Sequence, residues 1–371
     1  MPINRSGKNE GGVRVIIAGG GTGGHLFPAV AIAEEFLKRD NRNSVLFIGT
    51  EKGLEKRVLG DYGYPLRTIQ VEGIKGKGIL KSILSLFRIP RSIVQSWLII
   101  RDFSPHIVLG VGGYASGPAV MTAHLMGIKT AIAEQNALPG FTNRILGRFV
   151  MKIFLTFPDE KNIFSEKKVV ITGNPVRSEI CEVRDTIEEG GEMLRILVFG
   201  GSQGASSINR AVVASLPYLK NLKDRLMFIH QTGEKDVAEV SKAYLDNGMD
   251  AAVSPFIRDM ASVYRLANLV ICRAGATSVA EITALGKASI LIPYPFAVGN
   301  HQVLNAQLLH DAGAARMILE DDLTGESLAD LIRSLHQNRR MIRKMEKQSK
   351  KLGRKEAAAK IVDSCLELQR V

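Results

Sequence analysis

The stretch VRVIIAGGGTGG, residues 13–24, runs from an apolar segment directly into a glycine-rich turn. Its counterpart LRILVFGGSQGA, residues 194–205, repeats the pattern about half a chain length later. A short apolar run followed by a glycine turn and a helical stretch is typical of a parallel strand in a doubly wound α/β sheet. We expect the two helical stretches at about residues 28–39 and 207–216. The repeat therefore predicts two similar α/β halves.

Further short apolar runs follow in both halves and alternate with longer helical segments. We expect strands at residues 45–48, 106–110, 129–133, 152–155 and 169–172, and in the second half at 226–231, 269–272 and 288–292. Such runs indicate parallel sheets covered by helices on both faces. The fold class is therefore α/β, with two Rossmann-like doubly wound domains joined near Gly173-Asn174-Pro175. Residues 339–368 are expected to form one charged helix.

The composition is that of a globular protein with hydrophobic cores. The 371 residues, of which 45% are hydrophobic and 23% charged, suggest two domains. No apolar run approaches the roughly 18 residues of a membrane-spanning helix, and residues 1–12 lack the apolar centre of a secretory signal. Cys181, Cys272 and Cys365 are too far apart in sequence to suggest a compact metal site or a disulfide framework. We therefore expect a reducing, cytoplasmic compartment.

The net charge of +12 is unevenly distributed along the chain. Residues 1–170 contain 23 basic and 13 acidic side chains, residues 171–338 contain 15 and 20, and residues 339–371 contain 11 and 4. The basic first half predicts a polyanionic partner. Nucleic acid, an anionic membrane surface and a phosphorylated substrate all satisfy this condition.

The first glycine turn contains the pattern G-x-G-x-x-G from Gly19 to Gly24. A helix that starts behind such a turn directs N–H groups and its positive end at an anion, usually a phosphate. One interpretation is a dinucleotide site with Glu51 on the ribose, which would make the chain an oxidoreductase. A tight turn without a ligand is the plain alternative. However, one nicotinamide site would not explain two glycine turns, whereas two phosphate-rich ligands, or one ligand and a transition state held between the domains, would.

A series of short motifs resembles one family in family order across nearly the whole chain. The motifs are GGTGGH at residues 20–25, VGGYASGP at 111–118, EQN at 134–136, GNPVR at 173–177, GGSQGA at 200–205, RAGATSVAE at 273–281, HQ at 301–302 and NA at 305–306. The chain thus resembles the MurG family of bacterial transferases. These enzymes move N-acetylglucosamine from UDP-N-acetylglucosamine (UDP-GlcNAc) to lipid I, undecaprenyl-pyrophosphoryl-N-acetylmuramoyl-pentapeptide.

The resemblance implies the GT-B fold, in which two Rossmann-like domains face each other across a cleft. It implies a lipid-acceptor and membrane-facing domain at residues 1–173 and a UDP-GlcNAc-binding domain at 174–345. A C-terminal helix at 346–371 would return to the first domain. The implied reaction inverts the anomeric carbon and joins GlcNAc to the C4 hydroxyl of the MurNAc sugar, which yields lipid II for peptidoglycan. The enzyme would be peripheral at the cytoplasmic face of the bacterial inner membrane, with other cell-wall synthesis proteins as candidate partners.

The resemblance also implies a set of donor-site residues. Glu281 would take the ribose hydroxyls, Gln302 the sugar hydroxyls of GlcNAc, and the backbone of Ile257 the uracil edge. From the residues alone, Ser278-Val-Ala-Glu281 is equally a capping box at a helix start near Thr277. The complete UDP-GlcNAc set is Thr22, Gly23, Gly24, Asn136, Arg177, Ser202, Ile257, Ala276, Thr277, Ser278, Val279, Ala280, Glu281 and Gln302.

His25 follows the first glycine turn and is the candidate catalytic residue. A single inverting displacement needs a base for the acceptor hydroxyl but no covalent nucleophile, and histidine titrates near neutral pH. Alternatively, His25 only positions the acceptor or its diphosphate. Many relatives have histidine where this chain has Ala133, which leaves the role of that histidine open here.

Helix N-termini and backbone N–H groups can stabilise the leaving UDP, so we expect no obligatory metal, and any Mg²⁺ would accompany the diphosphate.

Residues 75–101 contain basic side chains and no acidic one. Cations interleaved with large apolar groups are typical of a helix that lies on an anionic membrane surface, although a core helix with a basic outer face has the same pattern. The expected membrane-facing residues are Lys75, Lys77, Ile79, Leu80, Lys81, Ile83, Leu84, Phe87 and Arg88. Few aromatic residues accompany the cations, so we expect no nucleic-acid partner. UDP-sugar epimerisation is the nearest enzymatic alternative.

Overall fold

The computed structural model describes residues 11–51, 55–71, 79–159, 161–182, 193–201 and 204–370, without the side chains of residues 57, 79–89 and 298. The chain divides into two compact units. The first comprises Met1–Gln135, Pro139–Pro175 and Glu356–Val371, and the second comprises Asn136–Leu138 and Val176–Lys355. The main division after Pro175 lies close to the boundary that we expected after residue 173.

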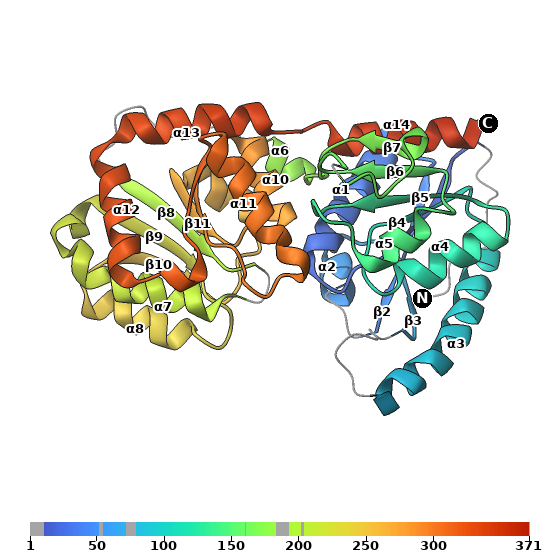
Figure 1. The fold of residues 1–371 in the computed structure, drawn as a ribbon, viewed down its shortest axis with the longest axis horizontal. Coiled ribbons are helices and arrows are strands. Elements are labelled where there is room, and N and C mark those ends of the chain that lie inside the picture. Colours follow the sequence, from blue (N-terminus) through green and yellow to red (C-terminus); the bar gives the residue numbers. More distant parts are fainter. Residues whose placement is uncertain are drawn as a thin grey trace. The chain divides into compact units, whose positions relative to one another are not determined.

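The first unit contains a parallel sheet in which the described strands have the order β3-β2-β1-β4-β5-β6-β7 (Figure 1). The strands are β1 (Arg14–Ala18), β2 (Ser44–Thr50), β3 (Leu66–Ile69), β4 (Ile107–Gly110), β5 (Lys129–Glu134), β6 (Lys152–Leu155) and β7 (Val169–Ile171). The helices are α1 (Gly23–Arg39), α2 (Glu55–Asp61), α3 (Ile79–Phe103), α4 (Ser116–Leu125), α5 (Phe141–Leu146) and α14 (Ala357–Arg370), with a 3-10 turn at Glu166–Lys168. Val15 and Ile17 pack into one core and Ile16 and Ala18 into another, which explains the unbroken apolar run of β1.

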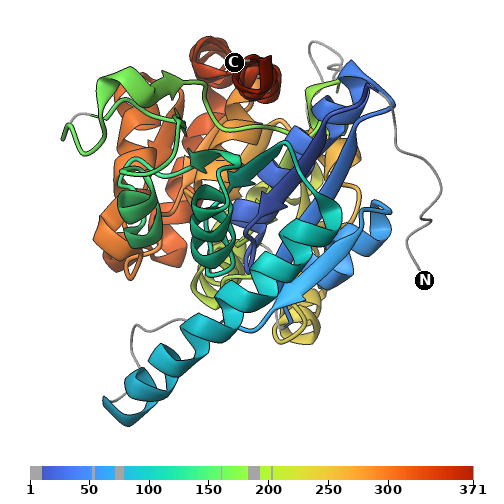
Figure 2. The same ribbon diagram turned by 90° about the vertical axis from the view of Figure 1, so that its right-hand side faces the viewer.

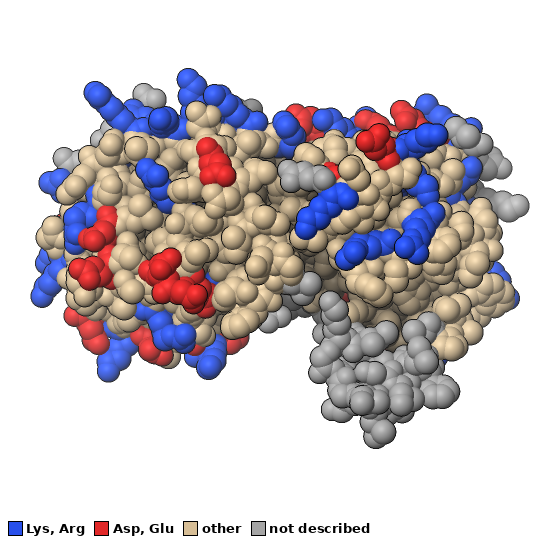
Figure 3. Space-filling view, viewed as in Figure 1, with Lys and Arg blue, Asp and Glu red and all other residues tan. Residues whose placement is uncertain are grey.

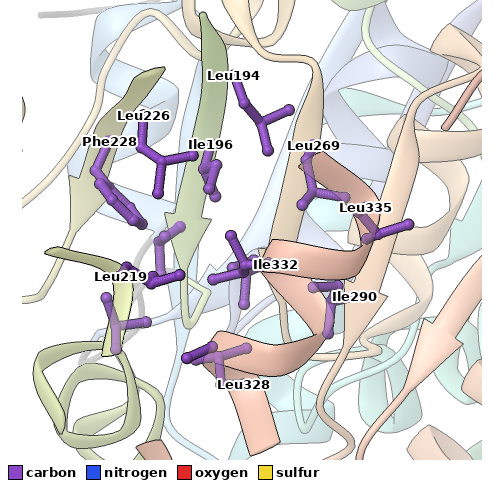
Figure 4. Packing of buried hydrophobic residues seen from close by; sticks show 14 of the residues in the cluster. Leu194, Ile196, Leu219, Leu226, Phe228, Leu269, Ile290, Leu328, Ile332 and Leu335 are labelled. Carbon is purple, nitrogen blue, oxygen red and sulfur yellow. The ribbon is translucent and has the colours of Figure 1, made fainter. Parts of the chain in front are cut away.

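The second unit repeats this topology with the order β10-β9-β8-β11-β12-β13. The strands are β8 (Leu194–Phe199), β9 (Leu226–Gln231), β10 (Asp250–Ser254), β11 (Leu269–Cys272), β12 (Ala288–Leu291) and β13 (Ala315–Met317). The helices are α6 (Ser178–Cys181), α7 (Ser206–Ser215), α8 (Val237–Asp246), α9 (Met260–Leu266), α10 (Ala276–Leu285), α11 (His301–Asp311), α12 (Gly325–Gln337) and α13 (Arg339–Leu352), with 3-10 segments at Leu216–Arg225, Val298–Asn300 and Glu320–Asp322. Leu328 and Ile332 of α12 pack against Ile196 and neighbouring strand residues (Figure 4). The expected α/β class with two doubly wound parallel sheets is confirmed.

Some elements differ from the sequence-based expectation. Strands β3, β10 and β13 were not expected, because they lie at or toward a sheet edge and are short or only half buried. Helix α1 begins at Gly23, five residues before the expected start at residue 28. His25 is therefore in the first turn of the helix and not in the preceding loop.

The expected single helix over residues 339–368 is wrong, since α13 and α14 are separate helices in different units. The chain leaves α13 at Gly353, where a Cβ atom would lie 2.5 Å from the carbonyl oxygen of Thr283. Helix α13 packs on α10, where Ser349 Oγ donates to the carbonyl oxygen of Ile282 at 3.4 Å, and its Ile342 and Met345 join the core between α12 and the second sheet. Helix α14 packs on α1 in the first unit.

The division between α13 and α14 also shows which unit contains the basic residues of the C-terminal segment. Residues 339–355 contain nine Lys and Arg against one Glu, whereas residues 356–371 contain two basic and three acidic side chains. Figure 3 shows Lys and Arg gathered along α13. The basic part of the C-terminal segment therefore belongs to the second unit, and the part that joins the first unit is slightly acidic.

Candidate active site

The second glycine turn lies at the carboxyl end of β8, the central strand of the second sheet. At Gly204, φ is +76° and a Cβ atom would lie 2.3 Å from the carbonyl oxygen of Thr232. Only glycine satisfies both conditions, so the turn passes directly against the end of β9. Ser202, one of the expected UDP-GlcNAc contacts, lies outside the described residues. In doubly wound sheets, ligands bind at these carboxyl ends, where the strand order reverses.

Gln231, which is 4% exposed at the end of β9, connects this turn to the expected uracil-binding position. Its Nε2 donates to the carbonyl oxygen of Gly201 at 2.9 Å, and its Oε1 accepts the N–H of Ile257 at 2.9 Å. The backbone of Ile257 is thus held in place by a side chain that the sequence did not single out. A polar residue at the carboxyl end of a buried strand is the signal that would have identified it.

Arg177 and Glu281, two of the expected donor-site residues, form a buried ion pair. Arg177 Nη2 lies 3.1 Å from Glu281 Oε1, and the two side chains are 4% and 7% exposed. Tyr264 donates its hydroxyl to Glu281 Oε2 at 3.1 Å, and Arg177 Nη1 also pairs with Glu179 at 2.8 Å. Burial raises the pKa of Glu281, while the charge and hydrogen bonds of Arg177 oppose that shift.

The capping-box interpretation of Ser278 and Glu281 is wrong. Helix α10 begins at Ala276, and its N-cap is Gly275 without a side-chain cap. Ser278 therefore lies inside the first turn and Glu281 in the second, where its carboxylate bonds Arg177 and Tyr264. This arrangement leaves Glu281 free of a capping role and is compatible with a ligand-binding one.

Arg273 connects the loops around the start of α10. Its guanidinium donates to Ser207 Oγ at 2.7 Å, to the carbonyl oxygens of Ile292 and Pro293 at 3.2 and 3.1 Å, and to Glu320. Gln302, the expected sugar contact, lies in the first turn of α11, and its Oε1 accepts the N–H of Tyr294 at 3.0 Å. Oε1 can accept one further hydrogen bond and Nε2 can donate two, so the sugar contact of Gln302 stays a prediction.

In the first unit, His25 is held between a strand end and a glycine. Its Nδ1 lies 2.9 Å from Oε1 of Gln135, which is 1% exposed at the end of β5. Gly112 has φ +92°, and a Cβ atom there would lie 2.7 Å from Cε1 and Nδ1 of His25. The ring is partly exposed. The motif around Gly112 thus supplies the space in which the imidazole lies.

The first glycine turn contains a carboxylate of the protein itself. Glu55, which is 1% exposed at the start of α2, accepts the N–H of Gly21 at 2.9 Å and that of Thr50 at 3.4 Å through Oε1. A dinucleotide phosphate uses the N–H groups of such a turn, and here the carboxylate has taken one of them. Glu51, the expected ribose ligand of the oxidoreductase interpretation, is exposed. The structure therefore disfavours a dinucleotide in this turn, and the sequence did not indicate Glu55.

The other expected residues have simpler surroundings. Thr22 is the N-cap of α1, where its side chain makes no capping hydrogen bond, and Gly23 and Gly24 begin the helix. Asn136 is half-buried and belongs to the second unit. Lys75 and Lys77 lie outside the described residues, as do the side chains of Ile79, Leu80, Lys81, Ile83, Leu84, Phe87 and Arg88. In the described part of the chain, no group of three or more His, Cys, Asp or Glu side chains is placed to hold a metal ion.

A buried histidine lies next to Gln231 and gives a pH-dependent prediction. His230 contacts the Tyr244 hydroxyl and Asn209 Oδ1, both at 3.1 Å, and burial lowers its pKa to about 4. The unfolded chain binds a proton near pH 6.5, so stability is complete above that pH and is lost as the pH falls toward 4. We expect a loss of about 3 kcal/mol from this residue.

Urea unfolding of the wild type and His230→Gln between pH 7 and 4 measures this effect. The variant, although less stable at pH 7, should show a shallower decline, whereas the exposed-residue control His124→Gln should follow the wild type. Parallel curves for His230→Gln and the wild type would refute the assignment.

Two parallel-sheet units with the same strand order, each with a glycine turn after its central strand, define a two-domain glycosyltransferase of the GT-B type. Family models described as the glycosyltransferase family 28 N-terminal and C-terminal domains match residues 15–155 and 195–361. The chain belongs to glycosyltransferase family 28 and, within it, to the MurG family.

Similar proteins agree with this membership. The chain is 57% identical to "UDP-N-acetylglucosamine--N-acetylmuramyl-(pentapeptide) pyrophosphoryl-undecaprenol N-acetylglucosamine transferase" of Syntrophus aciditrophicus, over 97% of this chain and 99% of the relative. The crystal structure of Acinetobacter baumannii MurG superposes with a TM-score of 0.76 at 32% identity, covering 96% and 99% of the two chains. A UDP-N-acetylglucosamine 2-epimerase superposes with a TM-score of 0.66 at 14% identity, over 96% of each chain, which shows a shared fold alone.

Proposed function

We propose that this protein transfers GlcNAc from UDP-GlcNAc to the C4 hydroxyl of MurNAc in lipid I, which yields lipid II for peptidoglycan synthesis. The observation that supports this most strongly is the 57% identity to a transferase of that name over nearly the full length of both chains. The epimerase alternative has only a shared fold at 14% identity in its favour.

The donor site proposed for the second unit rests on the groups described above. Glu281 accepts hydrogen bonds from the ribose hydroxyls, and the charge of Arg177 opposes the rise that burial causes in the pKa of its carboxyl group. The N–H groups at the start of α10 face the charge that develops on the leaving diphosphate. These groups make a protein-bound metal unnecessary, and any Mg²⁺ accompanies the diphosphate.

His25 is the general base in this proposal. An α-linked donor and a β-linked product require one inverting displacement, in which the C4 hydroxyl loses its proton as it attacks. His25 has a partly exposed ring, and its Nδ1 is already bonded to an amide, so Nε2 is the nitrogen that faces a substrate. The alternative, in which His25 only positions the acceptor, differs in its pH dependence.

A direct assay tests the reaction. The protein is incubated with radiolabelled UDP-GlcNAc and a lipid I analogue, and the products are separated by chromatography. We expect the label in a disaccharide-pyrophosphoryl lipid and no reaction without the acceptor. Label released only as free GlcNAc, or recovered only as an epimer, would contradict the transferase assignment.

We also propose that the first unit docks on an anionic membrane at the cytoplasmic face, through α3. No described helix is both long and apolar enough to cross a bilayer. The described half of α3 exposes Val94, Trp97 and Leu98 by 55%, 40% and 46%, and Arg101 lies 4.5 Å from the Trp97 ring. Apolar side chains beside cations suit the boundary between headgroups and acyl chains. Figure 2 shows the first turns of α3 extending away from the sheet of the first unit.

The double substitution Trp97→Ser and Leu98→Ser should weaken binding to phosphatidylglycerol vesicles by about tenfold or more, since partial burial of two such side chains contributes about 1–3 kcal/mol. Sedimentation with vesicles measures the binding. Activity on a water-soluble acceptor should stay unchanged.

The matched control replaces Arg340, Lys344 and Lys347 of α13, three exposed cations of the second unit, by Gln. If docking is specific to α3, the control binds vesicles nearly as well as the wild type. If binding is unspecific attraction of positive charge, the control loses more than the α3 variant, and the proposed surface is refuted. Other cell-wall synthesis proteins at the membrane are candidate partners. We expect no nucleic-acid partner.

A further inference from the structure

We infer that Gln135 is a positioning residue that fixes the tautomer of His25, so that Nδ1 carries the proton and Nε2 has the free lone pair. This inference rests on the proposed function, in which His25 accepts the proton of the acceptor hydroxyl. It assigns a role to a residue outside the expected site, and it arises from contacts inside the first unit.

The orientation of the Gln135 amide decides the direction of the hydrogen bond. Its Nε2 lies 3.4 Å from the carbonyl oxygen of Ala133, and its Oε1 lies 2.9 Å from His25 Nδ1. The reversed amide would place its oxygen opposite the Ala133 carbonyl oxygen, and two acceptors repel each other. Oε1 therefore faces the imidazole, and because an amide oxygen only accepts, Nδ1 is the protonated nitrogen.

The burial of Gln135 stabilises this orientation of its amide group. Gln135 is 1% exposed, so an amide that lost its partners would be left without water. The ring of His25 is limited in the same way, because it lies against Gly112, where even a methyl group would be 2.7 Å from Cε1 and Nδ1. The imidazole thus has a fixed plane as well as a fixed tautomer.

Position 133 explains why this role belongs to Gln135 in this chain. Ala133 is the second-last residue of β5, and Gln135 follows directly after the strand. The methyl group of Ala133 is 3% exposed and packs with Leu26 and Ala29 of α1. Ala133 has no polar group for His25, and its contribution is the carbonyl oxygen that orients Gln135.

Two substitutions test the assignment. Gln135→Leu removes the acceptor at similar size, whereas Gln135→Glu keeps an acceptor and adds a negative charge. The ¹⁵N chemical shifts of the His25 ring report the tautomer directly, independently of catalysis. A UDP-GlcNAc-dependent thermal shift confirms that each variant is folded.

For Gln135→Leu we expect a mixed tautomer and a kcat that is about 10- to 100-fold lower, as for other orienting partners of a histidine, with an unchanged KM for UDP-GlcNAc. For Gln135→Glu we expect the wild-type tautomer and an acid limb of the pH–rate profile that moves up by about one pH unit, because a carboxylate stabilises the imidazolium. A purely structural role of Gln135 would not move that limb.

The inference and the proposed function can fail separately. An unchanged ¹⁵N spectrum of His25 in Gln135→Leu would overturn the inference. A changed tautomer with an unchanged kcat would support the role of Gln135 and contradict the role of His25 as the base.

Discussion

The substitution His25→Gln is expected to lower kcat by about 10²- to 10⁴-fold, the usual contribution of a positioned general base. Glutamine can still form hydrogen bonds at this position but cannot take up a proton near neutral pH. The KM for UDP-GlcNAc should stay close to that of the wild type, because the side chains proposed to contact the donor, Arg177 and Glu281 among them, lie in the second unit. Initial rates with a lipid I analogue measure both constants.

The pH–rate profile separates a base from a residue that only positions the acceptor. If His25 is the base, the acid limb of the profile is absent in His25→Gln, since no group with that titration remains in the rate. If His25 only positions the acceptor, the limb persists and the KM for the acceptor rises. His124→Gln, a substitution of an exposed histidine on α4 of the same unit, is the control and should leave the profile unchanged.

The central strands of both sheets could be predicted because their sequences have a simple physical cause. Strand β1 is buried on both faces, so Val15 through Ala18 are all apolar, and β8 repeats this pattern in the second unit. The edge strand β3 includes Arg67 and Thr68, which are exposed and therefore carry no apolar run. A strand that is buried on both faces is apolar throughout and can be recognised in the sequence. An edge strand with exposed side chains has no such apolar run.

The positions of the glycine turns could be predicted from the sequence, but the groups that these turns contact could not. Glycine spacing indicates that a backbone turns tightly and approaches another group. It does not reveal that group, which is the side chain of Glu55 at Gly20 and the carbonyl oxygen of Thr232 at Gly204. Glu55 escaped the prediction for the same reason, since it reaches Gly21 from a helix that is 34 residues away in the sequence.

Most of the expected site residues came from the resemblance to a family and not from the physical properties of their side chains. The residues that orient these side chains could not be predicted, because their contacts join segments that are far apart in the sequence. Gln135 contacts a histidine 110 residues earlier, and Arg177 contacts a glutamate 104 residues later. The local S-x-x-E spacing at Ser278 also suggested a cap, but α10 begins at Ala276 and the Glu281 carboxylate bonds Arg177 instead.

The other large effect is expected for Arg177→Met, which should destabilise the second unit by about 3–5 kcal/mol. The methionine fills the space of the aliphatic stem, but the Glu281 carboxylate, 7% exposed, then keeps a single hydrogen-bond partner in the described part of the chain, the Tyr264 hydroxyl. Urea unfolding followed by circular dichroism measures the loss. Arg265→Met, which removes an exposed arginine of α9, is the control and should change stability by less than about 0.5 kcal/mol.

The pH dependence of this loss identifies its cause. Burial already raises the pKa of Glu281, and removal of Arg177 takes away the charge that opposes the shift. A carboxyl group whose pKa is higher in the folded state stabilises the fold fully below its unfolded value of about 4.3, and that stability is lost as the pH rises through the folded value. The difference between Arg177→Met and the wild type should therefore shrink as the pH falls from 8 to 5. The double variant Arg177→Met and Glu281→Gln, which has no buried charge, should recover much of the stability at pH 8. A loss that is the same at all pH values and persists in the double variant would mean that packing around Arg177, and not the unpaired carboxylate, holds this part of the fold together.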